Sequence, residues 1–276
     1  MVSFGQIVIG PPGSGKSTYC NGMSQLLNQT ERPCIVVNMD PANDFLPYDC
    51  ALNVMDLVSL EKVMESEGLG PNGGTIYCIE YLHDHFDWLE NALEPYLKEN
   101  YYIIFDCPGQ VELFTHITSM KGILGKLHKL DLRLCAIQLC DSSYCMDHTK
   151  YISALLLCLK TMLHIELPMI NVLSKIDLVE NSILLYELSF YKEASGLEYL
   201  LENLNFDKFG NKFKKLNEAI CELVEDFSLV SFETLNIQDK DSVSSLIKKI
   251  DKANGFVPFT QKEAYGTSKE IFASDK

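Results

Sequence analysis

The sequence predicts an α/β protein built on one doubly wound, mainly parallel sheet. The first observation is that short apolar runs recur along the chain, continuous rather than alternating, as expected of strands buried on both faces. The second is that helical patterns separate these runs, and strand–helix alternation builds parallel sheets covered by helices. With 276 residues, of which 47% are apolar, the chain can bury the core that such a domain needs.

Six segments are predicted to be strands because each is a short, Val/Ile/Leu-rich run. Their ranges are 6–10, 34–40, 101–106, 132–141, 168–174 and 228–232. Three helices are predicted from apolar residues that recur three and four positions apart. They cover 54–64 with a stop at Gly68, 213–224, and 243–250 with a stop at Gly255.

The alternation predicts a single domain over residues 1–255, without internal repeats. Within it, 178–207 is expected to be an inserted pair of helices between two strands. Residues 256–276 carry few apolar side chains and are expected to form a loosely held tail. The segment 151–163 is apolar nearly all round, which indicates either a fully buried helix or a subunit contact.

Charge and composition exclude several function classes. The net charge of −15 argues against direct nucleic-acid binding. The longest apolar run is too short to span a membrane, and the N-terminus lacks the basic region of a signal peptide. Ten cysteines without a CxxC pair indicate buried, reduced thiols. We therefore expect a cytoplasmic protein, with passage into the nucleus left open.

The run GPPGSGKST (10–18) matches the phosphate-loop pattern G-x-x-x-x-G-K-[ST], between a strand and a helix. Its glycines let backbone N–H groups point at phosphates, and the helix start adds partial positive charge. Lys16 is expected to reach the β- and γ-phosphates, and Ser17 to offer its hydroxyl to Mg²⁺. The predicted nucleotide-binding residues of this loop are Gly13, Ser14, Gly15, Lys16, Ser17 and Thr18.

Two further strand ends bring polar residues to the same edge of the sheet. In FDCPGQ (105–110), Asp106 is placed to hold a water on Mg²⁺, and Gly109 to donate its N–H to the γ-phosphate. Gln110 is placed to orient the attacking water. Asp40, at the end of another strand, is the next carboxylate that could face the metal or the water. The alternative for Asp40 is a turn carboxylate that caps a helix.

The run LSKID (173–177) closes the fifth predicted strand and indicates guanine as the base. The carboxylate of Asp177 can accept both the N1–H and the exocyclic amino hydrogens of guanine, a donor pair that adenine lacks. The stem of Lys175 would stack on the base. Ser174 stands where Asn is usual. A backbone contact to the guanine oxygen is expected from VSFETL (230–235).

Together, GPPGSGKST, NMDPAN, GPNGG, FDCPGQVEL and LSKIDL, in this order and at these intervals, resemble the GPN-loop GTPases. The resemblance covers residues 3 to about 255. It implies a phosphate-loop NTPase fold of the SIMIBI type, with GTP and Mg²⁺ as ligands and activity that depends on dimers. The partner would be a second copy or another GPN-loop GTPase. Because members assist assembly and nuclear delivery of RNA polymerase II, its subunits or assembly factors are implied as further partners.

A second glycine-rich stretch, Gly70-Pro71-Asn72-Gly73-Gly74, is shaped for a tight, exposed loop. The phosphates already have their own loop, but the site lacks an extra donor for transition-state charge. The only two arginines, Arg32 and Arg133, precede strands at the end opposite the nucleotide. As the resemblance implies, we expect Asn72 to donate its amide from the neighbouring subunit. The alternative is an ordinary helix-ending turn.

The predicted reaction is attack of water on the γ-phosphate of Mg-GTP within a dimer. Gln110 and Asp40 would orient the water, Lys16 and Mg²⁺ would hold the charge, and Asn72 would act across an interface centred on 151–163. Two alternatives stay open. A phosphate-loop kinase of small molecules or nucleotides would share the loop, although such enzymes usually clamp phosphates with arginines. A scaffold that binds GTP without turnover would assist assembly without catalysis.

Overall fold

The computed structural model describes residues 2–180, 184–204 and 212–257. In this part of the chain, seven parallel strands form one sheet in the order β3-β2-β4-β1-β5-β6-β7. The strands are β1 (Ser3–Ile9), β2 (Cys34–Asn38), β3 (Cys50–Asn53), β4 (Tyr102–Asp106), β5 (Leu132–Asp141), β6 (Met169–Ser174) and β7 (Phe232–Thr234). The order reverses at β1, so the predicted doubly wound, parallel α/β fold is confirmed.

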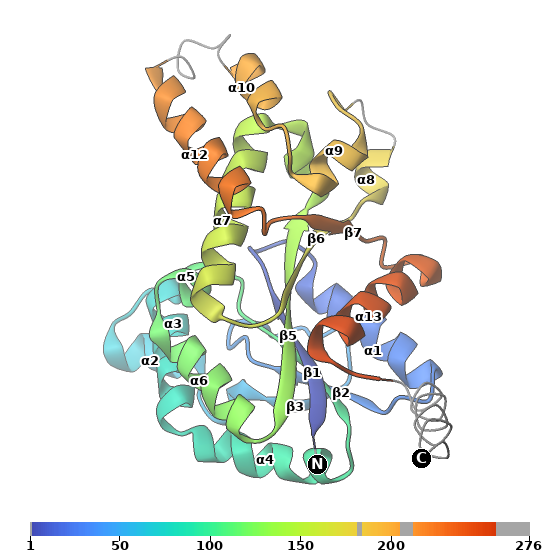
Figure 1. Cartoon of the computed structure of the whole chain (residues 1–276). Coiled ribbons are helices and arrows are strands. Elements are labelled where there is room, and N and C mark those ends of the chain that lie inside the picture. Colours follow the sequence, from blue (N-terminus) through green and yellow to red (C-terminus); the bar gives the residue numbers. More distant parts are fainter. Residues whose placement is uncertain (1, 181–183, 205–211, 258–276) are drawn as a thin grey trace, which may run out of the picture.

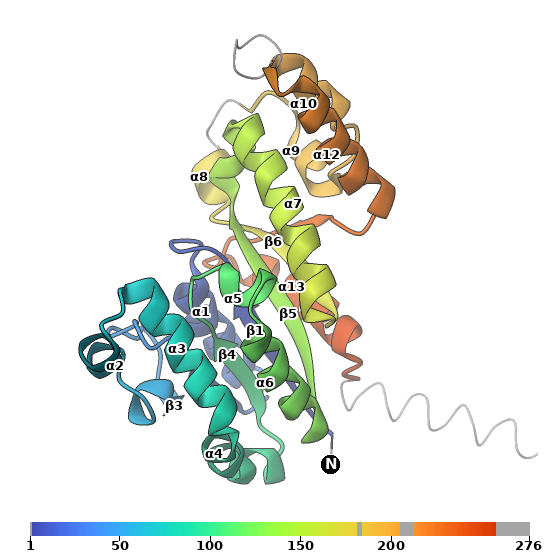
Figure 2. The same cartoon turned by 90° about the vertical axis from the view of Figure 1, so that its left-hand side faces the viewer.

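Helices cover both faces of the sheet (Figures 1 and 2). On one face lie α1 (Lys16–Gln29) and α13 (Lys240–Asn254), and on the other lie α3 (Pro71–Asp84), α4 (Phe86–Lys98) and α6 (Thr118–Lys129). Shorter elements are the 3₁₀ turns η1 (Val54–Asp56) and η2 (Ser142–Met146), and the helices α2 (Leu60–Glu67) and α5 (Glu112–Thr115). A further helical layer packs beyond the carboxyl ends of β5 and β6 and consists of α7 (His148–Ile165), α8 (Asp177–Glu180), α9 (Leu188–Glu193), α10 (Glu198–Leu204) and α12 (Lys214–Phe227).

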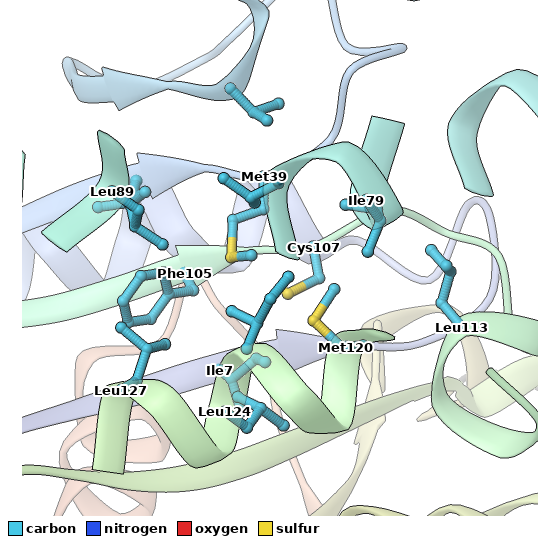
Figure 3. Close-up of a cluster of buried hydrophobic side chains, with 14 of the residues drawn as sticks. Ile7, Met39, Ile79, Leu89, Phe105, Cys107, Leu113, Met120, Leu124 and Leu127 are labelled. Atoms are coloured by element: carbon cyan, nitrogen blue, oxygen red, sulfur yellow. The ribbon is translucent and has the colours of Figure 1, made fainter. Parts of the chain in front are cut away.

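Alternate residues of the same strands enter two separate cores. Ile7 and Phe105 point into the cluster beneath α3, α4 and α6, which Figure 3 shows with Leu89, Leu124 and Leu127 packed around them. Val8 and Ile104 point the other way, against α1 and α13. Because successive side chains of a strand leave opposite faces, a strand that is apolar throughout is buried on both sides. All ten cysteines are free thiols, and every one except the half-buried Cys50 is buried.

Two strand predictions differ from the structure. The four-residue edge strand β3 was not predicted, since Cys50–Asn53 is half-buried and carries no continuous apolar run. The strand expected at 228–232 was wrong except at Phe232: the chain reaches the sheet only at β7, because Ser228 is the left-handed residue that ends α12.

Three helix predictions also need adjustment. The 54–64 pattern divides into η1 and α2, which ends at the left-handed Gly68 as expected. The segment 178–207 contains three short helices in its described residues rather than two; 181–183 and 205–207 lie outside them. In α7, Tyr151 and Leu155 are buried, but Leu163 is 51% exposed, so the helix is not buried on every side.

The predicted helices 213–224 and 243–250 are confirmed as α12 and α13, and Gly255 is the left-handed residue that ends α13. Just beyond it, Phe256 packs edge-to-face on Phe4 with ring centroids 5.2 Å apart. The rest of the expected tail, 258–276, lies outside the described residues.

Candidate active site

The phosphate loop connects β1 to α1, and its backbone requires glycine at several positions. Gly13 and Gly15 have φ angles of 77° and 91°, in the left-handed region that favours glycine. At Gly10, a Cβ would lie 2.5 Å from the carbonyl oxygen of Leu139, so β5 and the loop approach too closely for a side chain. Lys16 is the first residue of α1, and its ammonium donates to the Pro11 carbonyl at 3.4 Å. The loop is thus folded around the space in front of the helix N-terminus.

Asp106 ends β4 beside this loop and is 1% exposed. Its Oδ2 accepts a 2.8 Å hydrogen bond from the hydroxyl of Tyr48, whereas its Oδ1 has no hydrogen-bond partner. Burial raises the pKa of Asp106, and the nearby hydroxyls of Ser17 and Tyr48 and the charge of Lys16 oppose this rise. A buried carboxylate oxygen without a partner in the protein needs one from outside the chain, such as a water or a bound ion.

The carboxylate of Asp40 lies close enough to raise the pKa of Asp106 electrostatically. Burial raises the pKa of Asp40 itself. Its Oδ1 accepts the backbone N–H of Ala42 at 2.9 Å, so the turn-capping contact considered above is made, although no helix begins there. Asp40 therefore both shapes the turn after β2 and contributes negative charge next to Asp106.

The residues around Asp106 fit a magnesium ion. Mg²⁺ takes oxygen ligands, keeps several waters, and binds through one or two carboxylates together with substrate phosphates. The unpartnered Oδ1 of Asp106 and the hydroxyl of Ser17, which Asn43 approaches at 3.1 Å, supply such oxygens. In the part of the chain that the structure describes, no group of three or more His, Cys, Asp or Glu side chains gathers, so a magnesium ion here would depend on oxygens from the nucleotide and from water as well.

The turn after Asp106 rests directly on the phosphate loop. A Cβ on Gly109 would lie 3.1 Å from the Lys16 Nζ and 3.2 Å from the Cα of Pro12, so only glycine fits without a shift. The next side chain, Gln110, donates from its Nε2 to the Oδ1 of Asn72 at 3.5 Å. Gly109 and Lys16 are therefore brought together, and Gln110 is the next residue along the chain.

The glycine-rich stretch differs from the loop expected for it. Gly70 caps the N-terminus of α3, Pro71 is the first helical residue, and Asn72 lies in the first turn. Proline suits this position because its missing N–H would have no helical partner, so the tripeptide starts a helix rather than forming a loop. Asn72 is exposed, as expected, and in this chain it lies beside its own Gln110.

A pocket for the base opens between the phosphate loop and the ends of β6 and β7. Its lining comprises Ser14, Gly15, Thr18, Tyr19, Leu139, Ser174, Lys175, Asp177, Leu235, Asn236, Ile237 and Gln238. Asp177 is exposed at the start of α8, where its carboxylate can meet the polar edge of a purine. Of the segment 230–235, from which a backbone contact was expected, only Leu235 lines this pocket, and the lining continues through Asn236, Ile237 and Gln238.

Ser174 and Lys175 tie the base pocket to the phosphate loop. The hydroxyl of Ser174 donates to the carbonyl of Ser14 at 2.8 Å and that of Cys140 at 3.1 Å. The Lys175 ammonium donates to the Gly13 carbonyl at 2.6 Å and to Asp141 at 2.8 Å. Serine in place of asparagine therefore keeps a polar link to the loop.

Asp141 completes this link. Partial burial alone would raise the pKa of Asp141, but hydrogen bonds from Lys175 and Ser143 outweigh burial and lower it. The carboxylate therefore stays ionised opposite the Lys175 ammonium at neutral pH.

Comparison with known proteins gives concordant results. A family model described as "Conserved hypothetical ATP binding protein" matches residues 8–256. GPN-loop GTPase QQT1 of Arabidopsis thaliana is 55% identical over 256 residues, covering 92% of this chain and 86% of that protein. GPN-loop GTPase 2 of Danio rerio is 52% identical, and the match covers 92% of this chain and 81% of that protein. GPN-loop GTPase 2 of Saccharomyces cerevisiae is 49% identical, and the match covers 92% of this chain and 75% of that protein. The chain belongs to the GPN-loop GTPase family.

The fold agrees with this assignment. A GTPase from Pyrococcus abyssi, solved in its apo form, superposes with a TM-score of 0.73 at 22% identity, covering 92% of this chain and 98% of that one. The protein is a GTPase with a phosphate-loop NTPase fold, so the kinase alternative is set aside. No helix in the described residues is long and apolar enough to span a membrane.

Several residues at the site were not predicted. Tyr48 donates a hydrogen bond to Asp106, and Asn43 donates one to Ser17. Asp141 accepts a hydrogen bond from Lys175. Tyr48 and Asp106 are 58 positions apart, and no sequence pattern links them. Asp141 could have been found, since it ends a predicted strand next to the one that ends in LSKID, and neighbouring parallel strands end at one edge.

Proposed function

We propose that this GPN-loop GTPase hydrolyses Mg-GTP as a dimer, with Asn72 supplying an amide to the γ-phosphate region. The observation that carries this proposal is that Asn72 is exposed at this edge of the site, beside Gln110 and next to the turn whose Gly109 approaches Lys16. Three parts of the chain that are distant in sequence meet there. We infer that a γ-phosphate would extend from the phosphate loop toward this place, where amide groups could donate to it.

Each residue has a separate task in the proposed reaction. Lys16 and the helix N-terminus of α1 attract the negative charge of the β- and γ-phosphates. Ser17 and Asp106 would hold the magnesium ion, which neutralises charge on the phosphates when bound. Gln110 and Asp40 would orient the water for in-line attack. The Asn72 amide adds a donor where no arginine reaches, since Arg32 is paired with Asp251 at the opposite end.

The same-chain contact leaves two ways for Asn72 to act. It could serve its own site, or, if a second copy faces this edge, the exposed first turn of α3 could enter the partner's site. We favour the second arrangement because Asn72 is exposed, and its contact with Gln110 is long for an amide pair.

Subunit mixing tests the two arrangements. Lys16→Ala and Asn72→Ala proteins are each expected to hydrolyse GTP poorly. In a mixed dimer, one site would combine Lys16 of one chain with Asn72 of the other, so action across the interface predicts that mixing restores up to about a quarter of wild-type turnover, if subunits exchange at random. Failure to restore activity would place Asn72 in its own site. Wild-type turnover by Asn72→Ala alone would exclude its catalytic role.

We propose further that the client process is the assembly and nuclear delivery of RNA polymerase II, with its subunits or assembly factors as partners, and that the protein acts from the cytoplasm. Family membership supports this. The test is the location of the largest polymerase subunit after depletion of this protein and re-expression of wild type or Lys16→Ala. Cytoplasmic accumulation that only the wild type reverses is expected; nuclear polymerase in depleted cells would contradict the proposal.

A further inference from the structure

The segment 40–49, between β2 and β3, contacts both groups that would hold the metal. The Asn43 side chain donates to the Ser17 hydroxyl at 3.1 Å, and the Tyr48 hydroxyl donates to Asp106 at 2.8 Å. Between these two contacts, Phe45 is 91% exposed. The segment is thus fixed at two points on the metal-directed residues while its middle faces solvent.

The contact of Tyr48 is buried and firmly held. Tyr48 is 8% exposed, and its ring belongs to the core cluster between the sheet and α1, together with Tyr19 and Val36. The Tyr48 hydroxyl is the donor in this contact, since a carboxylate oxygen only accepts. A donor fixed by core packing sets the direction of the carboxylate that accepts from it.

Asp106 uses its two oxygens differently. Oδ2 accepts from Tyr48, whereas Oδ1 is buried without a partner. Rotation of the carboxylate would break the Tyr48 hydrogen bond, and a buried charged oxygen that loses its donor is costly. The hydrogen bond therefore keeps Oδ1 available to the ion and its waters.

We propose that Tyr48 is a positioning residue of this GTPase, which holds Asp106 in the orientation that binds Mg²⁺ together with Ser17. The inference rests on the proposed magnesium role of Asp106. This role would couple metal binding to the segment that follows Asp40. A metal that binds or leaves Asp106 acts on the same carboxylate that accepts the hydrogen bond of Tyr48.

The test measures magnesium coupling rather than turnover. A fluorescent GTP analogue is released from full-length protein, first in excess EDTA and then at increasing Mg²⁺, and the concentration that slows release half-maximally is recorded. Tyr48→Phe keeps the ring and removes the hydroxyl. We expect this concentration to rise about tenfold, as loss of a hydrogen bond to a charged group implies, with release in EDTA unchanged.

Tyr151→Phe is the matched control, since its buried hydroxyl donates to the Tyr191 carbonyl at 2.7 Å in the distant α7 cluster. It should leave the magnesium dependence at the wild-type value. Asp106→Asn separates the two proposals. If Asp106→Asn changes the Mg²⁺ concentration that slows release half-maximally but Tyr48→Phe keeps the wild-type value, only the role of Tyr48 is overturned. Wild-type values in both would overturn the magnesium role of Asp106, and the inference with it. Equal loss of affinity by Tyr48→Phe in EDTA and in Mg²⁺ would make Tyr48 merely structural.

Discussion

Among single residues, Asp177 is the one predicted to recognise the base, and its exposed carboxylate lines the pocket beside the phosphate loop. Asp177→Asn replaces one acceptor oxygen with an amide N–H donor. That donor would face the N–H groups of guanine, to which it cannot hydrogen-bond. Xanthine has a carbonyl where guanine has its amino group and can accept from that amide. We expect GTP affinity to fall about 100-fold and affinity for xanthosine triphosphate to rise, by calorimetry. Unchanged GTP affinity would remove Asp177 from base recognition.

Asp141 gives the site a pH dependence with a defined sign. Because the folded-state pKa of Asp141 lies below its unfolded value, the stability that this carboxylate contributes is present above the unfolded pKa and is lost as pH falls through the folded one. Asp141→Asn removes this contribution. The difference in melting temperature between wild type and Asp141→Asn should therefore be constant from about pH 5 to pH 8 and shrink below about pH 4. A difference that grows on acidification would contradict the assignment.

At the scale of elements, the turn after β4 depends on its close contact with the phosphate loop. Gly109→Ala adds a Cβ 3.2 Å from the Pro12 backbone, so the turn that carries Gln110 must shift by a few tenths of an ångström. We expect kcat to fall about tenfold with nucleotide affinity nearly unchanged, because a small misplacement affects the reaction more than binding. Gly125→Ala in α6, where a Cβ meets nothing within 4 Å, is the control and should keep wild-type kcat. Wild-type turnover in Gly109→Ala would show that this contact is not needed.

The elements also show what the sequence can and cannot predict. Strands β1, β2, β4, β5 and β6 were predicted because each is a contiguous apolar run, and the phosphate loop and LSKID were found because each motif is contiguous as well. β3 was missed because Cys50–Asn53 joins the sheet by backbone pairing to β2, which side-chain patterns do not record. The contacts of Tyr48 and Asn72 form only when separate elements pack together.

At the scale of the whole molecule, Arg32 links α13 and the residue Phe256 to the sheet. Its guanidinium pairs with Asp251 of α13 at 2.8 Å and lies between the rings of Tyr102, 4.0 Å away, and Phe256, 3.7 Å away. Both charged side chains are less than one-fifth exposed. Arg32→Ala leaves a buried carboxylate unpaired, so we expect about 3 kcal/mol of unfolding free energy to be lost, measured by urea denaturation.

The exposed pair of Lys98 and Glu94 provides the comparison. Its side chains are 70% and 61% exposed, and Lys98→Ala should cost less than about 0.5 kcal/mol. GTP affinity should be unchanged in Arg32→Ala, because Arg32 lies at the end of the sheet opposite the nucleotide. Equal stability losses in the two variants would show that Arg32 does not hold the C-terminal helix.

The burial of the thiols has a consequence for handling this protein. Desolvation raises the pKa of Cys34, Cys135 and Cys145 to about 12 each, so almost none of these sulfurs is ionised near neutrality. An alkylating reagent can therefore modify nine of the ten cysteines only in molecules that have opened. Mass spectrometry after a brief pulse of iodoacetamide would count these molecules directly, without any engineered label.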